Sequence, residues 1–262
     1  MSQYIIVFQF ARLSSFAMWL ILLLGCLFIG SKLTSGQFLE SDCGYMSREA
    51  LKNEGHQAHI SESPWMAYLH DSGKFLCGGT LINHRFILTA AHCISNGEDL
   101  TVRLGEYDSS TSHDCSGSVC IPPSEEFEID LAIRNGNYSR SQRYDDIGLL
   151  RLERSVEYKV HIKPICLITN PALQPMIEGL QRLVATGWGR SSLGSPSHIL
   201  KSIRVDRLGR SECRRRYLVD CRWDQICVGI VSYGNPECQS PSVFTDVMGH
   251  MTWIQWALDL YS

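Results

Sequence analysis

The sequence predicts an all-β protein with a helix at its C-terminus. Short apolar runs recur along the chain with turn-forming residues between them, which is typical of a β-sandwich or a β-barrel. The last residues instead repeat apolar side chains at helical spacing. With 44% hydrophobic and 19% charged residues, the chain can bury a core and does not have the composition of a disordered protein.

Each predicted strand is an apolar run that ends near a turn signal such as Asp71-Ser72-Gly73 or Gly105. In chain order, the main runs are residues 65–69, 80–82, 86–88, 102–104, 147–152, 183–186, 199–205, 230–233 and 243–247. The helix is predicted from an i, i+4 stripe that contains Trp253, Ile254, Ala257, Leu258 and Tyr261. No long linker, low-complexity tract or internal repeat divides these elements, and a barrel protein of 262 residues commonly forms one domain.

Charge and cysteine content restrict the class of protein further. Lys and Arg number 24 against 27 Asp and Glu, so the chain has no global basic field, and we expect no nucleic-acid partner. Eleven cysteines indicate an oxidising compartment and a disulfide framework.

The N-terminus has the pattern of a secretory signal. Arg12 precedes an apolar run at residues 16–29, and Thr34-Ser35-Gly36 supplies small residues for cleavage. We therefore predict a signal peptide at 1–36, a secreted, extracellular chain that begins near Gln37, and no membrane association after cleavage. A signal anchor is the alternative, which the apolar residues 5–10 favour. Against it, Arg12 interrupts a run shorter than the roughly 20 residues that a spanning helix needs.

Two segments carry residues suited to acid–base chemistry. Leu88-Thr89-Ala90-Ala91-His92-Cys93 places an imidazole beside small residues and a cysteine, although a lone histidine there is more often a core residue. Asp145-Asp146-Ile147-Gly148 places carboxylates before an apolar strand.

Together with other motifs, these segments resemble the trypsin-like serine proteases of the chymotrypsin family (S1). The further matching segments, in the family's order from about His56 to the end, are Ser63-Pro64-Trp65, Cys77-Gly78-Gly79-Thr80, Lys163-Pro164-Ile165-Cys166, Thr186-Gly187-Trp188-Gly189, Gln225-Ile226-Cys227, Val231-Ser232-Tyr233-Gly234 and Pro241-Ser242-Val243-Phe244. The resemblance implies two packed antiparallel β-barrels with the active site between them. It also implies domain boundaries: a short N-terminal extension at 37–55 and a protease domain at 56–262.

The resemblance assigns roles to particular residues. His92 is the general base, and Asp146 is the carboxylate that fixes its tautomer and stabilises the imidazolium. Asp145 is expected to be a solvated neighbour. Ser232, Tyr233 and Gly234 match the wall of the substrate-binding pocket.

The segment that holds the family's nucleophile has no counterpart here. The family places Gly-Asp-Ser-Gly-Gly-Pro between the matches of Cys227 and Ile230, where this chain has only Val228 and Gly229, and Gly-Asp-Ser-Gly occurs nowhere in it. In the family, the same segment also supplies the backbone amides of the oxyanion hole and the residue at the base of the specificity pocket, so these are absent as well. We therefore expect an incomplete second barrel and treat enzymatic activity as an open question.

The activation site also departs from the family. Residues 50–56 keep Gly55 but have no Ile-Val pair after a basic residue. Cleavage after Arg48 would give a terminus at Glu49, whose charge suits a buried pocket poorly.

The resemblance also implies disulfides. These are Cys77–Cys93, Cys43–Cys166, Cys115–Cys120, and Cys213 with either Cys227 or Cys221. In the family, the counterpart of Cys238 pairs with a cysteine next to the nucleophile, and that cysteine is absent here. Cys238 and one of Cys221 or Cys227 are therefore left over, either bonded to each other or free. A zinc site at His113, Cys115 and Cys120 is the weaker alternative because it has no evident fourth ligand.

Other features suggest surface ligands. No metal or cofactor is expected, except that acidic residues could surround calcium as in some family members: Glu106, Asp108, Glu125, Glu126 and Glu128. An arginine-rich stretch could bind polyanions, but Asp206, Glu212 and Asp220 interrupt it, and a solvated face is the simpler interpretation; its members are Arg204, Arg207, Arg210, Arg214, Arg215 and Arg216. Asn137-Tyr138-Ser139 is a glycosylation sequon.

Three functions are compatible with this sequence. The first is a secreted, catalytically inactive homologue that binds extracellular proteins or components of a protease cascade. The second is an active serine endopeptidase whose sequence here lacks an exon. The third is a poorly folding product.

Overall fold

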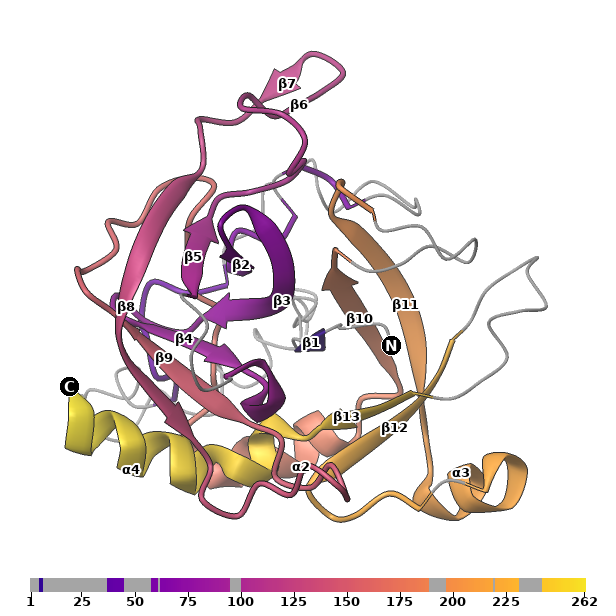
Figure 1. Cartoon of the computed structure of the whole chain (residues 1–262). Coiled ribbons are helices and arrows are strands. Elements are labelled where there is room, and N and C mark those ends of the chain that lie inside the picture. Colours follow the sequence, from indigo (N-terminus) through magenta and orange to yellow (C-terminus); the bar gives the residue numbers. More distant parts are fainter. Residues whose placement is uncertain are drawn as a thin grey trace, which may run out of the picture.

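A computed structural model of the chain describes residues 5–6, 37–44, 58–60, 62–94, 100–188, 197–218, 220–230 and 242–262 (Figure 1). Of the predicted signal peptide, only β1 (Ile5–Ile6) lies in the described part, where it pairs with β10 (Arg182–Gly187). The activation segment at 50–56 lies outside it. In the described part, no helix combines the length and apolarity that a bilayer crossing requires.

The first half of the chain closes into a six-stranded antiparallel barrel, in the order β2-β3-β4-β9-β8-β5. Its strands are β2 (Met66–Asp71), β3 (Lys74–Leu81), β4 (Phe86–Thr89), β5 (Thr101–Leu104), β8 (Glu125–Arg134) and β9 (Gly148–Leu152). Alternate side chains of these strands point inward, and Leu69, Leu104 and Leu150 are fully buried in the barrel core. A small hairpin of β6 (Cys115–Ser116) and β7 (Val119–Cys120) projects from it (Figure 1).

The strands of the second half, with β1 at one edge, form an open sheet in the order β1-β10-β11-β12-β13. β11 (Lys201–Leu208) pairs with β10 and with β12 (Gln225–Ile230), which in turn pairs with β13 (Ser242–Thr245). A small core of Leu183, Val205, Ile226 and Val228 lies on this sheet. The predicted all-β fold with an incomplete second barrel is thus confirmed.

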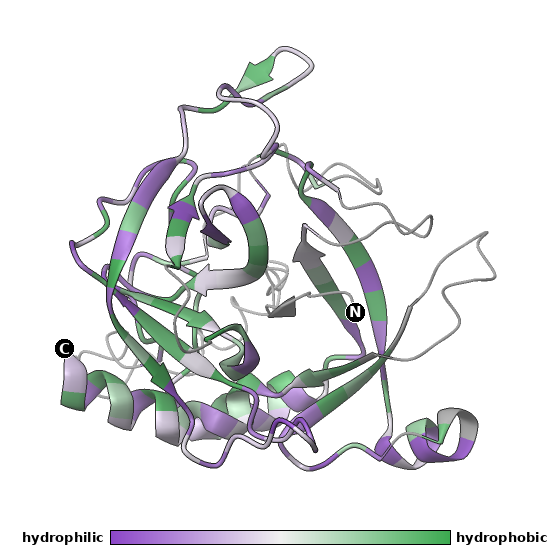
Figure 2. Ribbon diagram, in the orientation of Figure 1, coloured by the Kyte–Doolittle hydropathy of each residue, from purple (hydrophilic) through white to green (hydrophobic). Residues whose placement is uncertain are grey.

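A third core joins the two halves to the C-terminal helix. α4 (Met251–Tyr261) follows the 3₁₀ turn η5 (Val247–His250), and its apolar face, including Ile254 and Ala257, is fully buried against that core. Figure 2 shows both apolar and polar residues along this helix, and its buried residues, Met251, Ile254, Ala257 and Leu258, recur at helical spacing. Trp188 joins the same core and meets Tyr68 edge to face at 5.2 Å.

The sequence analysis missed one barrel strand and the short helical elements of the described part, α2 and α3 among them. β8 alternates Glu126 and Glu128, which are exposed, with the buried Phe127, so its charges hide the strand from a search for apolar runs. α3 (Arg210–Tyr217) coincides with the arginine-rich stretch, and η3 (Pro171–Leu173) leads into α2 (Gln174–Glu178). Of the predicted run at 230–233, only Ile230 is described, at the end of β12.

Candidate active site

A single 3₁₀ turn holds the predicted base. η2 (Ala91–Cys93) follows β4, and both Ala91 and Cys93 are buried, so His92 between them must point outward. The disulfide Cys77–Cys93 fixes the turn to β3. The imidazole is 42% exposed, which leaves it accessible from solvent.

The structure brings His92 and Asp146 together. Nδ1 of His92 donates to Oδ2 of Asp146 at 2.7 Å, and the backbone N–H of His92 donates to Oδ1 at 2.9 Å. Because an ionised carboxylate only accepts, the contact places the imidazole proton on Nδ1 and leaves Nε2 as the free basic nitrogen. The hydroxyl of Thr245 on β13 donates to the backbone oxygen of Asp146 at 3.0 Å, so the second sheet also holds this segment.

Gly148 allows His92 and Asp146 to lie in contact. It begins β9, and a Cβ added there would lie 2.5 Å from Cδ1 of Ile94, 3.1 Å from the backbone oxygen of Ile133 and 3.6 Å from Cα of Ala91. The absence of a side chain therefore lets the η2 turn pack directly on β9. Since Asp146 lies two residues before Gly148, this packing sets the distance between His92 and its carboxylate.

The described residues include no attacking group for this base. Among them, no hydroxyl or thiol forms a hydrogen bond with Nε2 of His92. Ser232, Tyr233 and Gly234, which the sequence analysis assigned to the pocket wall, lie outside the described residues. Val228 and Gly229, which stand where the nucleophile segment is absent, lie within β12 and pair with Arg207 and Asp206 of β11.

The expectation that Asp145 is solvated is wrong. Asp145 is 9% exposed, and its backbone N–H donates to Oδ2 of Asp224 at 3.2 Å. His250, the last residue of η5, lies within 4.0 Å of both carboxylates, and burial lowers the pKa of its imidazole. Asp145 has a positive φ of 52°, and one oxygen of its carboxylate lies 3.7 Å from the guanidinium of Arg222. The cluster joins the segments that precede β9, β12 and α4, beside the candidate site.

The carboxylates and the imidazole of this cluster are side chains that commonly bind metal ions, but the guanidinium of Arg222 already lies beside them. Atoms of Asp145, Asp224 and His250 lie within 4.8 Å of one another. Nε of Arg222 stands 3.0 Å from Oδ1 of Asp224, and its guanidinium also covers the ring of Tyr144. Arg222 therefore supplies the positive charge that a metal ion would bring.

Four disulfides join the described cysteines, and they are those that the family resemblance implies. They are Cys43–Cys166, Cys77–Cys93, Cys115–Cys120 and Cys213–Cys227. The choice left open for Cys213 thus falls on Cys227, and Cys221 has no disulfide partner among the described residues. Cys238 lies outside them. Because Cys115 and Cys120 are bonded to each other, the zinc alternative at His113 loses its two thiolates.

Four of the five acidic residues considered for calcium have other partners; the exception is Glu128, which is exposed. Glu106 Oε2 accepts from Arg103 at 3.1 Å, Glu126 also pairs with Arg103, and Glu125 pairs with Lys159 at 2.7 Å. Asp108 accepts from Ser110. These carboxylates are not among the groups of possible metal ligands in the described part.

Sequence reasoning missed the central residue of this acidic loop. Asp114 is buried, and its Oδ2 accepts from the backbone N–H groups of Tyr107 and Asp108 at 2.8 and 3.1 Å. Next to it, burial raises the pKa of Glu106 to about 7, and the charge of Asp114 adds to the effect. A buried acid pair therefore holds the loop that leads to β6.

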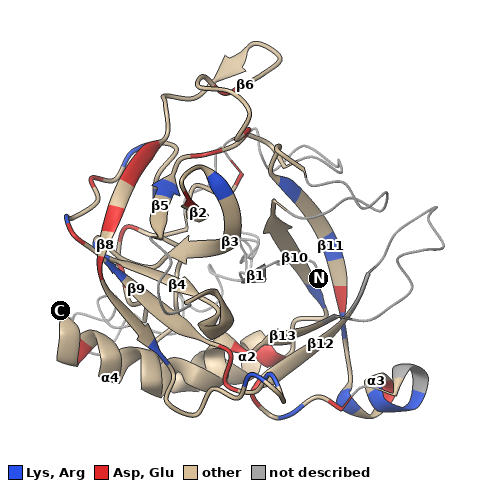
Figure 3. Ribbon diagram, in the orientation of Figure 1, with Lys and Arg blue, Asp and Glu red and all other residues tan. Residues whose placement is uncertain are grey.

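The two predicted surface features lie at the surface. Asn137 of the sequon is exposed in a turn. In the arginine-rich stretch, Arg214 pairs with Asp220 at 3.3 Å and Arg207 lies 3.7 Å from Asp246, so part of its charge is compensated (Figure 3).

Comparisons with known proteins agree with the fold. The family model described as Trypsin matches residues 52–242. Serine protease grass of Drosophila melanogaster is 36% identical over 72% of this chain and 52% of its own length. Phenoloxidase-activating factor 1 of Holotrichia diomphalia is 35% identical over 74% of this chain and 57% of its own length. CLIP domain-containing serine protease HP8 of Bombyx mori is 32% identical over 82% of this chain and 71% of its own length. The chain thus spans little more than half the length of the first two relatives.

A solved structure has the same architecture. The crystal structure of the Drosophila Grass clip serine protease of the Toll pathway superposes with a TM-score of 0.68 at 31% identity, and covers 81% of this chain and 73% of that one. Together, the family match and the fold show that this chain belongs to the trypsin family of serine proteases.

Proposed function

We propose that this chain is a secreted member of the trypsin family that binds proteins of an extracellular protease cascade and does not cleave them. One observation carries the proposal: the sequence passes from Cys227 to Ile230 through Val228 and Gly229 alone, without Gly-Asp-Ser-Gly. Acyl transfer needs an attacking oxygen beside the base and backbone donors aimed at the oxyanion, and the family supplies both from that segment.

The remaining framework supports a binding role. The first barrel is closed, and Cys77–Cys93 together with the Asp146 contact holds His92 in place. A rigid body of this kind presents surface loops to a partner without any need for turnover. Relatives named as a phenoloxidase-activating factor and as a protease of the Toll pathway support a cascade component as that partner.

Domain limits and processing belong to the same proposal. A signal peptide at 1–36 precedes an extension at 37–55 and the protease-like domain at 56–262, and Asn137 carries a glycan. Expression in secretory cells should give a product that begins near Gln37 and loses mass on deglycosylation. A membrane-bound product that retains Met1 contradicts the processing.

A turnover measurement tests the absence of catalysis. The purified chain is cleaved after Arg48 with an added protease and given ester substrates with Arg, Lys, Phe and Leu side chains. We expect the same rate as for a His92→Ala variant, because the base has nothing to activate. Hydrolysis that depends on His92 contradicts the proposal.

A second candidate function is serine endopeptidase, from a longer form of this chain. The observation that favours it is the intact His92–Asp146 contact of 2.7 Å, which a binding protein does not need. Sequencing the transcript across the codons for Cys227 to Ile230 separates the two. An in-frame segment that encodes Gly-Asp-Ser-Gly-Gly there supports the enzyme.

A further inference from the structure

The turn that carries Asp146 connects the two halves of the chain. This turn, residues 143–146, lies shortly before β9 of the first barrel, and we call it the acid turn. Each of its four residues contacts a residue that lies on β12, on β13 or just before β12. These contacting residues are Arg222, Asp224, Gln225 and Thr245. The second half of the chain therefore holds the segment whose carboxylate orients His92.

Two hydrogen bonds hold the ends of the acid turn. The side-chain amide of Gln225, the first residue of β12, donates to the backbone oxygen of Arg143 at 3.1 Å. The hydroxyl of Thr245, the last residue of β13, donates to the backbone oxygen of Asp146 at 3.0 Å. Gln225 and Thr245 are paired neighbours across β12 and β13. One position of the open sheet thus holds both ends of the turn.

Charged groups hold the middle of the acid turn. Asp224 is fully buried, and its Oδ2 accepts from the backbone N–H of Asp145 at 3.2 Å. Nε of Arg222 lies 3.0 Å from Oδ1 of Asp224, and Nη2 of the same guanidinium lies 3.7 Å from Oδ2 of Asp145. The guanidinium also covers the ring of Tyr144 at 4.3 Å. Hydrogen bonds to charged groups contribute more than those between neutral groups, so the middle of the turn is held more firmly than its ends.

His250 packs against these groups without adding a charge at neutral pH. Its imidazole is buried and lies within 4.0 Å of the carboxylates of Asp145 and Asp224, with Asp246 and Arg222 as further charged neighbours. Burial lowers the pKa of this imidazole below its usual value of 6.5, so the ring is neutral at pH 7. The guanidinium of Arg222 is then the cation that balances the two carboxylates.

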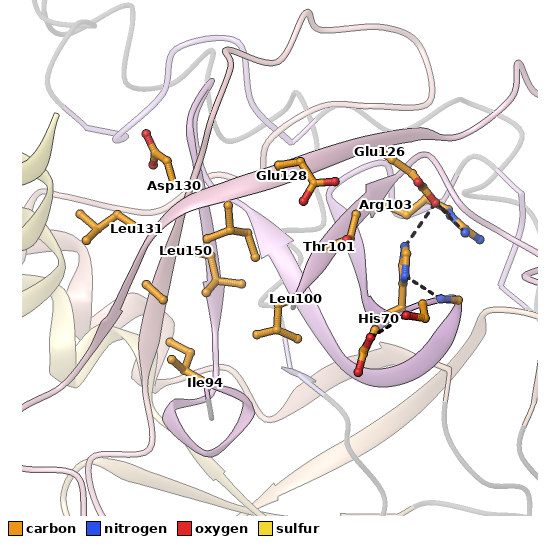
Figure 4. A pocket seen from close by; sticks show the side chains of 15 residues that line it. His70, Ile94, Leu100, Thr101, Arg103, Glu126, Glu128, Asp130, Leu131 and Leu150 are labelled. Carbon is orange, nitrogen blue, oxygen red and sulfur yellow. Dashed lines mark hydrogen bonds and ion pairs between the residues drawn. The ribbon is translucent and has the colours of Figure 1, made fainter. Parts of the chain in front are cut away.

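The acid turn is separate from the pocket of about 720 Å³ beside β2, β5 and β8. Figure 4 shows that pocket, with His70 and Glu126 among its lining residues. Neither the acid turn nor the residues that hold it line the pocket. Variants of the acid turn therefore leave the lining of the pocket unaltered.

We propose that Arg222, Asp224 and Thr245 are positioning residues for His92, because they hold the carboxylate of Asp146 against its imidazole. Gly148 sets this contact from within the first barrel, where it lets η2 pack on β9. The three positioning residues set it from the second half of the chain, by fixing the turn that ends at Asp146.

This positioning gives the incomplete second sheet a task of its own. The sheet keeps the base and its carboxylate in contact, although the chain has no nucleophile segment between Cys227 and Ile230. The inference goes beyond the proposed function, since it applies equally to a binding protein and to a longer, active form.

The Nδ1 proton of His92 reports on the contact in NMR spectra. In its 2.7 Å hydrogen bond to Asp146, this proton should resonate at low field and exchange slowly with water, and the His92→Ala variant assigns its signal. Thr245→Val removes one donor to the turn and keeps the shape of the side chain, so exchange should become about threefold faster. Arg222→Gln combined with Asp224→Asn removes the central ion pair and should make exchange about tenfold faster. Arg222→Lys keeps the positive charge and should give an intermediate rate.

A matched control makes the same two substitutions at another ion pair. Arg214→Gln combined with Asp220→Asn removes a 3.3 Å pair whose side chains are 76% and 75% exposed, and should leave the exchange rate unchanged. The backbone amide signals of β4 and β9 show in each variant whether the first barrel is folded.

Unchanged exchange of the Nδ1 proton in the Thr245 and Arg222 variants overturns the proposal, even if they lower the free energy of unfolding, because a purely structural role has only that effect. If the double variant does not fold, Thr245→Val and Arg222→Lys decide the question by the same criterion. The readout needs neither a nucleophile nor a substrate, so its failure is distinguishable from failure of the ester-turnover test.

Discussion

The clearest test of the buried electrostatics is the substitution Glu106→Gln. Glu106 is 5% exposed, and burial raises the pKa of its carboxyl from 4.5 to about 7. The native state therefore holds a proton on Glu106 that the unfolded chain has already lost between these pH values. For such a group, the free energy of unfolding is unaffected below pH 4.5 and falls as pH rises from 4.5 to 7.

The size of this fall follows from the two pKa values. A rise from 4.5 to about 7 corresponds to at most about 3 kcal/mol. Water beside the partly exposed Arg103, which donates to Oε2, also solvates the ionised carboxylate and reduces the effect of burial, so we expect about 2 kcal/mol. Glutamine resembles the protonated carboxyl and cannot ionise, and the variant should lack this fall.

Urea denaturation at pH 5 and pH 8 measures the effect. Trp188 is a suitable reporter, since it is buried and its indole N–H donates to the backbone oxygen of Tyr107 at 3.2 Å. We expect the free energy of unfolding of Glu106→Gln, relative to the unmodified chain, to be about 2 kcal/mol higher at pH 8 than at pH 5.

The variant and the unmodified chain share all other titrating groups, so comparing the two cancels the contribution of those groups to the pH dependence of the free energy of unfolding. Burial lowers the pKa values of His70, His161 and His250, which makes stability rise with pH up to about 6.5 and partly hides the Glu106 effect in the unmodified chain. Glu157→Gln, which changes an exposed carboxylate outside this loop, is the control substitution. If Glu106→Gln shows no larger pH-dependent difference than this control, the reasoning about Glu106 is wrong.

Three further predictions concern packing, disulfides and local stability. Gly148→Ala should destabilise the chain by about 1–3 kcal/mol, because the added Cβ would overlap Ile94, and should shift the His92 imidazole resonances in NMR spectra; unchanged stability and resonances contradict the packing argument. Cys221→Ser should leave Cys213–Cys227 intact in non-reducing peptide maps, since Cys221 lies outside that bond, and loss of the bond would assign Cys213 to Cys221 instead. Hydrogen exchange should be slower in the closed barrel through Leu152 than in the open sheet after Leu183, and uniform protection of both halves contradicts this.

The sequence predicts the fold well where apolar residues cluster and poorly where charge interrupts them. The apolar runs at 65–69 and 147–152 overlap the barrel strands β2 and β9. They are easy to predict because an unbroken run of apolar side chains is stable where it is buried. β8 is missed because one face of it is acidic, and α3 is missed because its arginines give it no apolar stripe. Apolar residues at every second position, Phe127, Ile129, Leu131 and Ile133, are the signal that could have identified β8.

The candidate site is predictable only through family resemblance. No spacing rule places His92 beside Asp146, which lies 54 residues further along the chain. Asp145 is misjudged because its environment comes from Asp224 and His250, and no local pattern links three segments so far apart. The same holds for Glu106, whose burial depends on the fold of the loop around Asp114.

The central claim is that this chain has the base and its carboxylate but no nucleophile. Intact mass spectrometry after exposure to a fluorophosphonate probe tests it most directly, because the probe remains bound to an activated serine. For the chain cleaved after Arg48, we expect no added mass beyond that of a His92→Ala control. A single probe adduct that disappears in the His92→Ala variant would contradict the claim, and would make Ser232 the first serine to replace.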